Sequence, residues 1–268
     1  MQTETIRSAD GTTLRLGHSG EGERTILIVP GLAEHLGRYD HIVAALNEAG
    51  WKTAVIELRG HGQSGGKRGH VMQWTEYLDD LRAAAKAVGG PLVLLGHSMG
   101  GLVALDAAIE GVGVEVQGLV LSDPNVAVAV HAPAVKLMGA RVLSRIAPGL
   151  SMSNELDASS LSRDRSVVEA YLEDPLVYST ITPRWFTEMV KSQNRVIAHA
   201  NRYKVPLLML LGEGDVICDW KASAALARNW GGDAKTIQYP EMYHEIFNEI
   251  GKEQVIGDMV SWLGELST

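Results

Sequence analysis

The chain has 268 residues, 46% of them hydrophobic, which is enough to bury one large core and requires no second domain. Its 24 Lys and Arg residues against 32 Asp and Glu residues give a net charge of -8. This charge argues against nucleic acid and anionic membrane surfaces as partners, because both attract basic patches. The single cysteine, Cys218, excludes an intramolecular disulfide and fits a reducing compartment.

The first residues lack the basic and apolar regions of a signal peptide. The longest apolar runs, such as residues 205–211, are far too short to cross a bilayer. We therefore expect a soluble, cytoplasmic protein.

In chain order, residues 5–16 come first; they are divided by Asp10-Gly11 and predict an antiparallel hairpin at a sheet edge. Near-continuous apolar runs then predict parallel strands covered on both faces, at residues 25–29, 53–58, 92–95, 119–121 and 207–211. Helical patterns occupy residues 40–49, 75–88, 102–109 and 254–266. This alternation is typical of an α/β fold with right-handed crossovers.

The alternation stops after residue 121, and residues 124–204 contain helical patterns without a convincing strand. We interpret them as a helical cap inserted into a core made of residues 1–123 and 205–268. Within it, residues 132–146 are unusually apolar for a surface helix. They either pack within the cap or form an acyl-chain entrance or interfacial lid.

The motif Gly96-His97-Ser98-Met99-Gly100 follows an apolar strand and leads directly into a helix. A serine on such a sharp turn is a candidate nucleophile, and the small Gly96 and Gly100 leave room for the turn. The pattern Gly-x-Ser-x-Gly is weak alone, but the strand-turn-helix context makes it specific.

A serine nucleophile needs a histidine base. His244 is the best of nine histidines, since it lies late in the chain, in a turn before the final helix. His97 adjoins the nucleophile, but its side chain should point away, which indicates a structural role. For His61 and His70, in a Gly-rich loop, we expect solvent exposure.

The base in turn needs a carboxylate to orient it. Asp215 follows the last apolar strand, and binding groups gather at the carboxyl ends of such strands. Asp123, after the preceding strand, and Asp219 are less favoured alternatives. The oxyanion of the tetrahedral intermediate needs two donors, which we assign to the backbone N–H groups of Met99 and Leu32.

Five segments together resemble the monoacylglycerol lipase and lysophospholipase branch of the α/β-hydrolase family. They are Gly31-Leu32-Ala33-Glu34-His35-Leu36-Gly37-Arg38-Tyr39, Leu58-Arg59-Gly60-His61-Gly62-Gln63-Ser64, Gly96-His97-Ser98-Met99-Gly100-Gly101, Asp174-Pro175-Leu176-Val177-Tyr178 and Tyr243-His244-Glu245-Ile246-Phe247-Asn248-Glu249. Each is modest alone, but their order matches that of the family over nearly the whole chain.

The resemblance implies an α/β-hydrolase fold and a serine hydrolase of single-chain acyl esters, with Ser98, Asp215 and His244 as catalytic triad and Leu32 and Met99 as oxyanion donors. It also implies that Glu34 and Arg38 lie near the alcohol end of the pocket; a surface ion pair at helical spacing is the alternative. Pro30 and Glu57 depart from the common His and Asp of the family, which affects substrate fit more than mechanism. Cys218 matches a cysteine near the pocket of some relatives, although a buried thiol is more often a small hydrophobe.

The leading hypothesis is hydrolysis of monoacylglycerol to glycerol and fatty acid through an acyl-enzyme on Ser98, with no metal or organic cofactor. A lysophospholipase or a short- or medium-chain carboxylesterase is the alternative. Haloperoxidase or carbon–carbon bond hydrolase chemistry can use the same scaffold. A non-catalytic ligand-binding homologue is the alternative of another class. The expected partner is a small lipid ester, with transient contact of the cap with a lipid interface.

Overall fold

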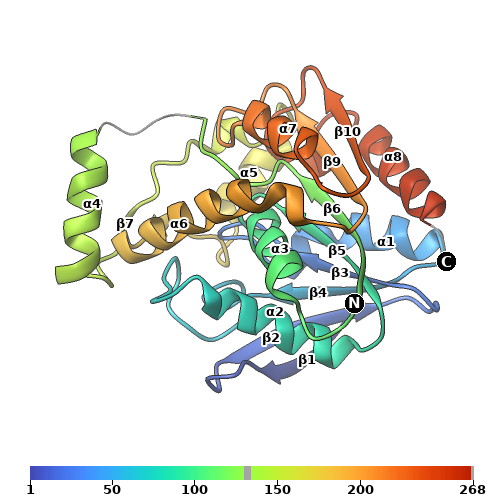
Figure 1. The fold of residues 1–268 in the computed structure, drawn as a ribbon, viewed down its shortest axis with the longest axis horizontal. Coiled ribbons are helices and arrows are strands. Elements are labelled where there is room, and N and C mark those ends of the chain that lie inside the picture. The colour runs from blue at the N-terminus through green and yellow to red at the C-terminus, as the bar shows by residue number, and fades with distance from the viewer. Residues whose placement is uncertain (130–133, 267–268) are drawn as a thin grey trace.

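An eight-stranded sheet forms the centre of the computed structural model, which describes residues 1–129 and 134–266 (Figure 1). The strand order is β1-β2-β4-β3-β5-β6-β9-β10. The strands are β1 (Gln2–Arg7), β2 (Thr13–Ser19), β3 (Thr25–Val29), β4 (Lys52–Glu57), β5 (Leu92–His97), β6 (Val116–Ser122), β9 (Leu207–Gly212) and β10 (Ala234–Tyr239). The predicted hairpin is the antiparallel pair β1 and β2 at one edge, and from β4 to β10 neighbouring strands are parallel.

Helices cover both faces of the sheet, as the apolar strands require. Every residue of β3, β5 and β9 is buried. One apolar core joins one face of the sheet to α2 (Thr75–Val88), α3 (Met99–Glu110) and α7 (Trp220–Arg228). A second core joins the other face to α1 (Asp40–Glu48) and α8 (Lys252–Glu265). The chain therefore has the α/β fold expected from the alternating pattern, and this arrangement agrees with the α/β-hydrolase fold that the family resemblance implied.

Between β6 and β9 the chain leaves the sheet and forms α4 (Ala134–Ile146), α5 (Arg165–Glu173) and α6 (Pro183–His199). A short antiparallel pair, β7 (Met152–Ser153) with β8 (Thr180–Ile181), also lies here. No strand was expected in this segment, and two-residue strands are too short to leave an alternating pattern. At the start of the helix predicted at residues 132–146, Ala132 and Pro133 lie outside the described residues.

The inserted segment has two parts with different surroundings. Helix α6 packs on α3, where Ser192 and Arg195 bind the buried carboxylate of Asp106. Helix α4 stands at the left of Figure 1, away from the sheet, and contacts α6. Over residues 1–129 and 134–266, the helices are all too short or too polar to cross a bilayer.

The parallel strands place the ends of β3, β5, β6 and β9 along one edge of the sheet. The segments that follow these strands carry Gly31, Ser98, Asp123 and Asp215 respectively. Residues separated by more than a hundred positions in the sequence are thus brought to the same edge.

Candidate active site

Ser98 occupies a strained turn between β5 and α3. Its backbone φ is +51°, a left-handed value that side chains other than glycine rarely adopt. The flanking glycines make this turn sterically feasible. A Cβ on Gly96 would lie 2.6 Å from the carbonyl oxygen of Gly100, and a Cβ on Gly100 would lie 2.0 Å from that of Val29.

His244 lies in the loop between β10 and α8, and its ring meets the hydroxyl group of Ser98. The distance from Nε2 of His244 to Oγ of Ser98 is 2.9 Å, and both residues are buried. On its other side, Nδ1 lies 2.7 Å from Oδ2 of Asp215. An ionised carboxylate only accepts, so Nδ1 carries the proton and Nε2 accepts from the serine hydroxyl group.

Asp215 is held by its own loop after β9. Its Oδ1 accepts hydrogen bonds from the backbone N–H groups of Ile217 (2.7 Å) and Cys218 (3.0 Å). The segments that carry Asp215 and His244 touch at Gly212, where a Cβ would lie 2.5 Å from the carbonyl oxygen of Tyr243. A glycine at this position lets Asp215 approach His244.

The two alternative acids have other partners. Asp219 caps the N-terminus of α7 by accepting from the N–H groups of Lys221 and Ala222. Asp123 accepts from the N–H of Gly212 at 2.9 Å, while its buried Oδ2 has no hydrogen-bond partner among the described residues. Burial and the neighbouring Asp215 raise the pKa of the Asp123 carboxyl well above its usual range, which favours its uncharged form.

The electrostatics of His244 fit a base paired with a carboxylate. Burial lowers the pKa of the ring, but the charge of Asp215 and its hydrogen bond outweigh burial, and the net pKa is raised above 6.5. His97 lies beside this ring at a centroid distance of 4.9 Å and directs Nδ1 toward Ser122. Burial lowers the pKa of His97 to about 4, so it stays uncharged next to the base.

The loop after β3 lies directly against Ser98. A Cβ on Gly31 would be 3.3 Å from Cβ of Ser98 and 2.9 Å from Oε2 of Glu34. Met99 is the first residue of α3, where a helix has free N–H groups. This is the arrangement that the assignment of Leu32 and Met99 as oxyanion donors requires, and the assignment itself stays a prediction.

Glu34 and Arg38 form the ion pair that their spacing offered as the alternative to substrate contact, but the pair is buried rather than on the surface. The side chains are 5% and 9% exposed, and Nε of Arg38 lies 3.2 Å from Oε1 of Glu34. Nη2 of Arg38 also binds both carboxylate oxygens of Glu245, at 2.7 Å and 2.6 Å. Sequence reasoning missed Glu245 as a partner, although it directly follows the predicted base.

The expectation of solvent exposure for His61 was wrong, since it is only 2% exposed. Its Nδ1 bonds to the carbonyl oxygen of Arg59 at 2.9 Å, and its Nε2 meets the hydroxyl group of Tyr178 at 3.0 Å. The inserted segment brings Tyr178 over this loop, which no local pattern could show. His70 is half-buried, with Nδ1 2.9 Å from the hydroxyl group of Thr182.

Glu57, a position at which the family resemblance implied an aspartate, is buried between the segment after β3 and the loop after β4. It accepts from the N–H groups of Leu36 (3.2 Å) and Gln63 (2.6 Å). Its role in the structure is therefore to join the segment after β3 to the loop after β4.

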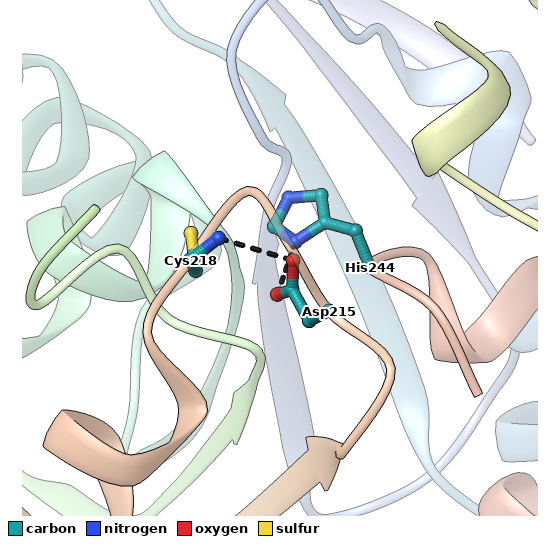
Figure 2. A group of neighbouring side chains, drawn as sticks. All are labelled: Asp215, Cys218 and His244. Atoms are coloured by element: carbon teal, nitrogen blue, oxygen red, sulfur yellow. Dashed lines mark hydrogen bonds and ion pairs between the residues drawn. The ribbon is translucent and has the colours of Figure 1, made fainter. Parts of the chain in front are cut away.

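Figure 2 shows Asp215, Cys218 and His244, whose potential metal-ligand atoms lie within 4.8 Å of one another. Asp215 and His244 already bond to each other there. Burial and the nearby carboxylates raise the pKa of the Cys218 thiol well above its usual range, so the thiol keeps its proton. The group is best described as an acid and base pair beside a neutral thiol.

Comparison with known proteins gives consistent similarities. Residues 20–251 match the family model described as serine aminopeptidase, S33. The chain is 34% identical over 245 residues to a monoacylglycerol lipase of Mycolicibacterium smegmatis, covering 89% of this chain and 87% of the relative. It is 30% identical to the phospholipase YtpA of Bacillus subtilis, covering 86% and 91%.

Among solved structures, a monoacylglycerol lipase of Paleococcus ferrophilus superposes with a TM-score of 0.89 at 34% identity. The match covers 95% of this chain and 99% of that one. The similarity therefore extends through the inserted segment as well as the sheet.

Proposed function

Because the chain belongs to the serine aminopeptidase S33 family of serine hydrolases, we propose that it cleaves carboxylic esters of single-chain lipids, with monoacylglycerol as the preferred substrate. The observation that carries the proposal is the relay from Ser98 through His244 to Asp215, with successive distances of 2.9 Å and 2.7 Å. Such a relay activates a hydroxyl group for attack on an acyl carbon.

In the acylation half-reaction, Oγ of Ser98 attacks the ester carbonyl carbon and its proton moves to Nε2 of His244. The N–H groups of Leu32 and Met99 stabilise the negative charge that develops on the carbonyl oxygen. The intermediate collapses when Nε2 returns the proton to the departing glycerol oxygen. Asp215 stays ionised and stabilises the imidazolium throughout.

In the deacylation half-reaction, a water molecule attacks the acyl-enzyme carbonyl carbon and gives a proton to Nε2 of His244. Collapse of the second intermediate breaks the bond to Oγ of Ser98, which regains that proton. Free fatty acid leaves, and the enzyme returns to its starting state. Apart from the substrate and this water molecule, each step uses groups that the chain itself supplies.

The proposed lipid substrate is supported by the inserted segment, residues 124–204, which we interpret as the cap. On α4 the side chains of Met138, Val142 and Ile146 are 62%, 57% and 74% exposed. Their spacing of four residues places them on one face of the helix. An exposed apolar face of this kind suits transient contact with a lipid interface. A cytoplasmic location belongs to the same proposal.

A lysophospholipase is the second candidate function, favoured by the similarity to a phospholipase at 30% identity. A short- or medium-chain carboxylesterase would use the same relay. A binding protein without catalysis is the candidate of another class, and the intact geometry at Ser98 argues against it.

Substrate profiling tests the proposal. Initial rates are measured on monoacylglycerols, lysophospholipids and p-nitrophenyl esters of several chain lengths, and monoacylglycerols should give the highest kcat/KM. Cleavage of lysophospholipids without cleavage of monoacylglycerols would show that the preferred substrate is wrong. A fluorophosphonate probe that leaves the native protein unlabelled would contradict catalysis altogether.

A further inference from the structure

Three buried charged side chains connect the loop that carries the predicted oxyanion donor to the loop that carries the predicted base. Glu34 and Arg38 follow β3, whereas Glu245 directly follows His244. Glu34 and Glu245 are 4% and 3% exposed, and Arg38 bonds to both. Charges buried this deeply are costly unless they are paired, so the geometry of the pairing constrains both loops.

Glu34 is hydrogen-bonded to the segment after β3 that carries Leu32, the predicted oxyanion donor, which we call the oxyanion loop. Its Oε2 accepts from the backbone N–H of Gly31 and from the hydroxyl group of Tyr39, both at 2.6 Å. Its Oε1 accepts from Nε of Arg38. Burial raises the pKa of Glu34, but the neighbouring His97 and Arg38, together with the hydrogen bonds that the carboxylate accepts, lower it to about 2, so the carboxylate stays charged at neutral pH.

Arg38 links Glu34 to the loop that carries His244, the predicted base. Its Nη2 contacts both oxygens of Glu245, and Oε2 of Glu245 also accepts from the side chain of Asn248 at 2.9 Å. The guanidinium carbon lies 5.0 Å from the centroid of the Tyr171 ring on α5, which places the inserted segment over the same side chain. Three parts of the structure therefore meet at Arg38.

The cavity beside these side chains has room for little more than a water molecule. The cavity bordered by Glu34, His97 and Glu245 is about 10 Å³, roughly what one water molecule needs. The carboxylate oxygens of Glu34 and Glu245 are already bonded within the protein. Their geometry suits positioning of the loops better than contact with glycerol.

We propose that Glu34, Arg38 and Glu245 form an ionic clamp that fixes the separation of the oxyanion loop and His244, and that Arg38 is a positioning residue for acyl transfer. The inference rests on the proposed serine-hydrolase function. It replaces the substrate-contact role that the family resemblance implied for Glu34 and Arg38. A displacement of either loop by a fraction of an ångström would weaken binding of the oxyanion more than binding of the substrate.

The test compares Arg38→Met with Arg38→Lys and Glu245→Gln. Arg195→Met is the matched control, because it also breaks an ion pair to a buried carboxylate, that of Asp106, on a different part of the molecule. We expect Arg38→Met to lower kcat about 10²–10³-fold, as for loss of one oxyanion donor, with KM changed less than about threefold. Arg38→Lys should recover part of kcat, and Arg195→Met should keep it.

An unchanged kcat with a KM raised tenfold in Arg38→Met would overturn the clamp and restore substrate contact. Unchanged kcat and KM would also overturn it. If Arg38→Met does not fold, Glu245→Gln tests the clamp instead. A glutamine has the shape of the glutamate side chain without its charge, so this variant should still lower kcat. Fluorophosphonate labelling of Ser98 separates the two proposals: slower labelling of Arg38→Met supports the clamp even if the native protein fails to cleave monoacylglycerol.

Discussion

Oγ of Ser98 and Nε2 of His244 lie 2.9 Å apart, although 146 positions separate the two residues in the chain. The first stands at the end of β5 and the second in the loop after β10. Because Nδ1 of the ring faces Asp215, the nitrogen that faces Ser98 is the one able to accept a proton.

Replacement of Ser98 by alanine should abolish ester hydrolysis, with a loss of about 10⁴-fold or more in kcat, because the nucleophile itself is removed. Labelling by a fluorophosphonate probe should be lost as well. Ser159→Ala is the control, because Ser159 is exposed in the inserted segment, far along the chain from the site. The probe should label this variant at the native rate. Retained labelling of Ser98→Ala would place the nucleophile elsewhere.

The pH dependence of kcat/KM should show an acid limb governed by His244. The ring must be neutral to accept the proton of Ser98, and its pKa is raised above 6.5, so activity should fall as pH decreases through that raised value. Asp215→Asn removes the carboxylate that raises the pKa. We expect the limb to move to lower pH and the maximal rate to fall by about 10⁴-fold.

Asp123→Asn is the matched control for Asp215→Asn. Burial and Asp215 raise the pKa of the Asp123 carboxyl and so favour its uncharged form, and an asparagine keeps an oxygen that can accept from Gly212. The maximal rate of Asp123→Asn should stay within about threefold of the native rate, and the acid limb of its pH profile should lie at the native pH. A large loss in Asp123→Asn with little loss in Asp215→Asn would reverse the assignment of the acid.

Gly31→Ala should reduce kcat by about 10²-fold, the effect expected when one oxyanion donor is displaced. The new Cβ would lie 2.9 Å from Oε2 of Glu34 and 3.2 Å from the His97 ring, so either the loop or the Glu34 side chain that holds it has to shift. Gly257→Ala is the control, because a Cβ there meets nothing within 4 Å in helix α8. It should leave kcat unchanged and raise stability by up to about 1 kcal/mol. Equal activity of the two variants would contradict a fixed oxyanion loop.

Replacing Met138, Val142 and Ile146 together by glutamine should weaken binding to phospholipid vesicles at least about tenfold, because the apolar face of α4 is lost. Hydrolysis of a water-soluble short-chain ester should remain at the native rate. Leu172→Gln on α5, 68% exposed in the native chain, serves as the control and should bind vesicles as before. Native binding by the triple variant, measured by vesicle sedimentation, would exclude α4 as the contact.

Much of the architecture could be read from local patterns. The ranges predicted for β3 and α2 match the structure residue for residue, and the other predicted ranges differ from the structure at their ends, whereas no separate range was predicted for α5, α6 or α7. Buried parallel strands need continuous apolar runs, and amphipathic helices need a period of 3.6 residues, so both leave clear signals. The paired strands β7 and β8 were missed because each has two residues.

The chain order of Ser98, Asp215 and His244 also follows from the sequence, because each residue stands beside a strand end or turn that can be recognised locally. What the sequence could not decide is which buried charges meet. Asp123 and Asp215 both follow apolar strands, and only the loop geometry directs Asp215 to His244.

Sequence alone thus determined the elements, their order and the residue types able to perform acyl transfer, since these depend on neighbours along the chain. The tertiary structure decided the partners. It buried His61 under Tyr178, left one face of α4 exposed, and paired Arg38 with a residue 207 positions away. Such contacts depend on how separate segments pack, and for this reason the strained serine turn meets its proposed base, acid and clamp only in the folded chain.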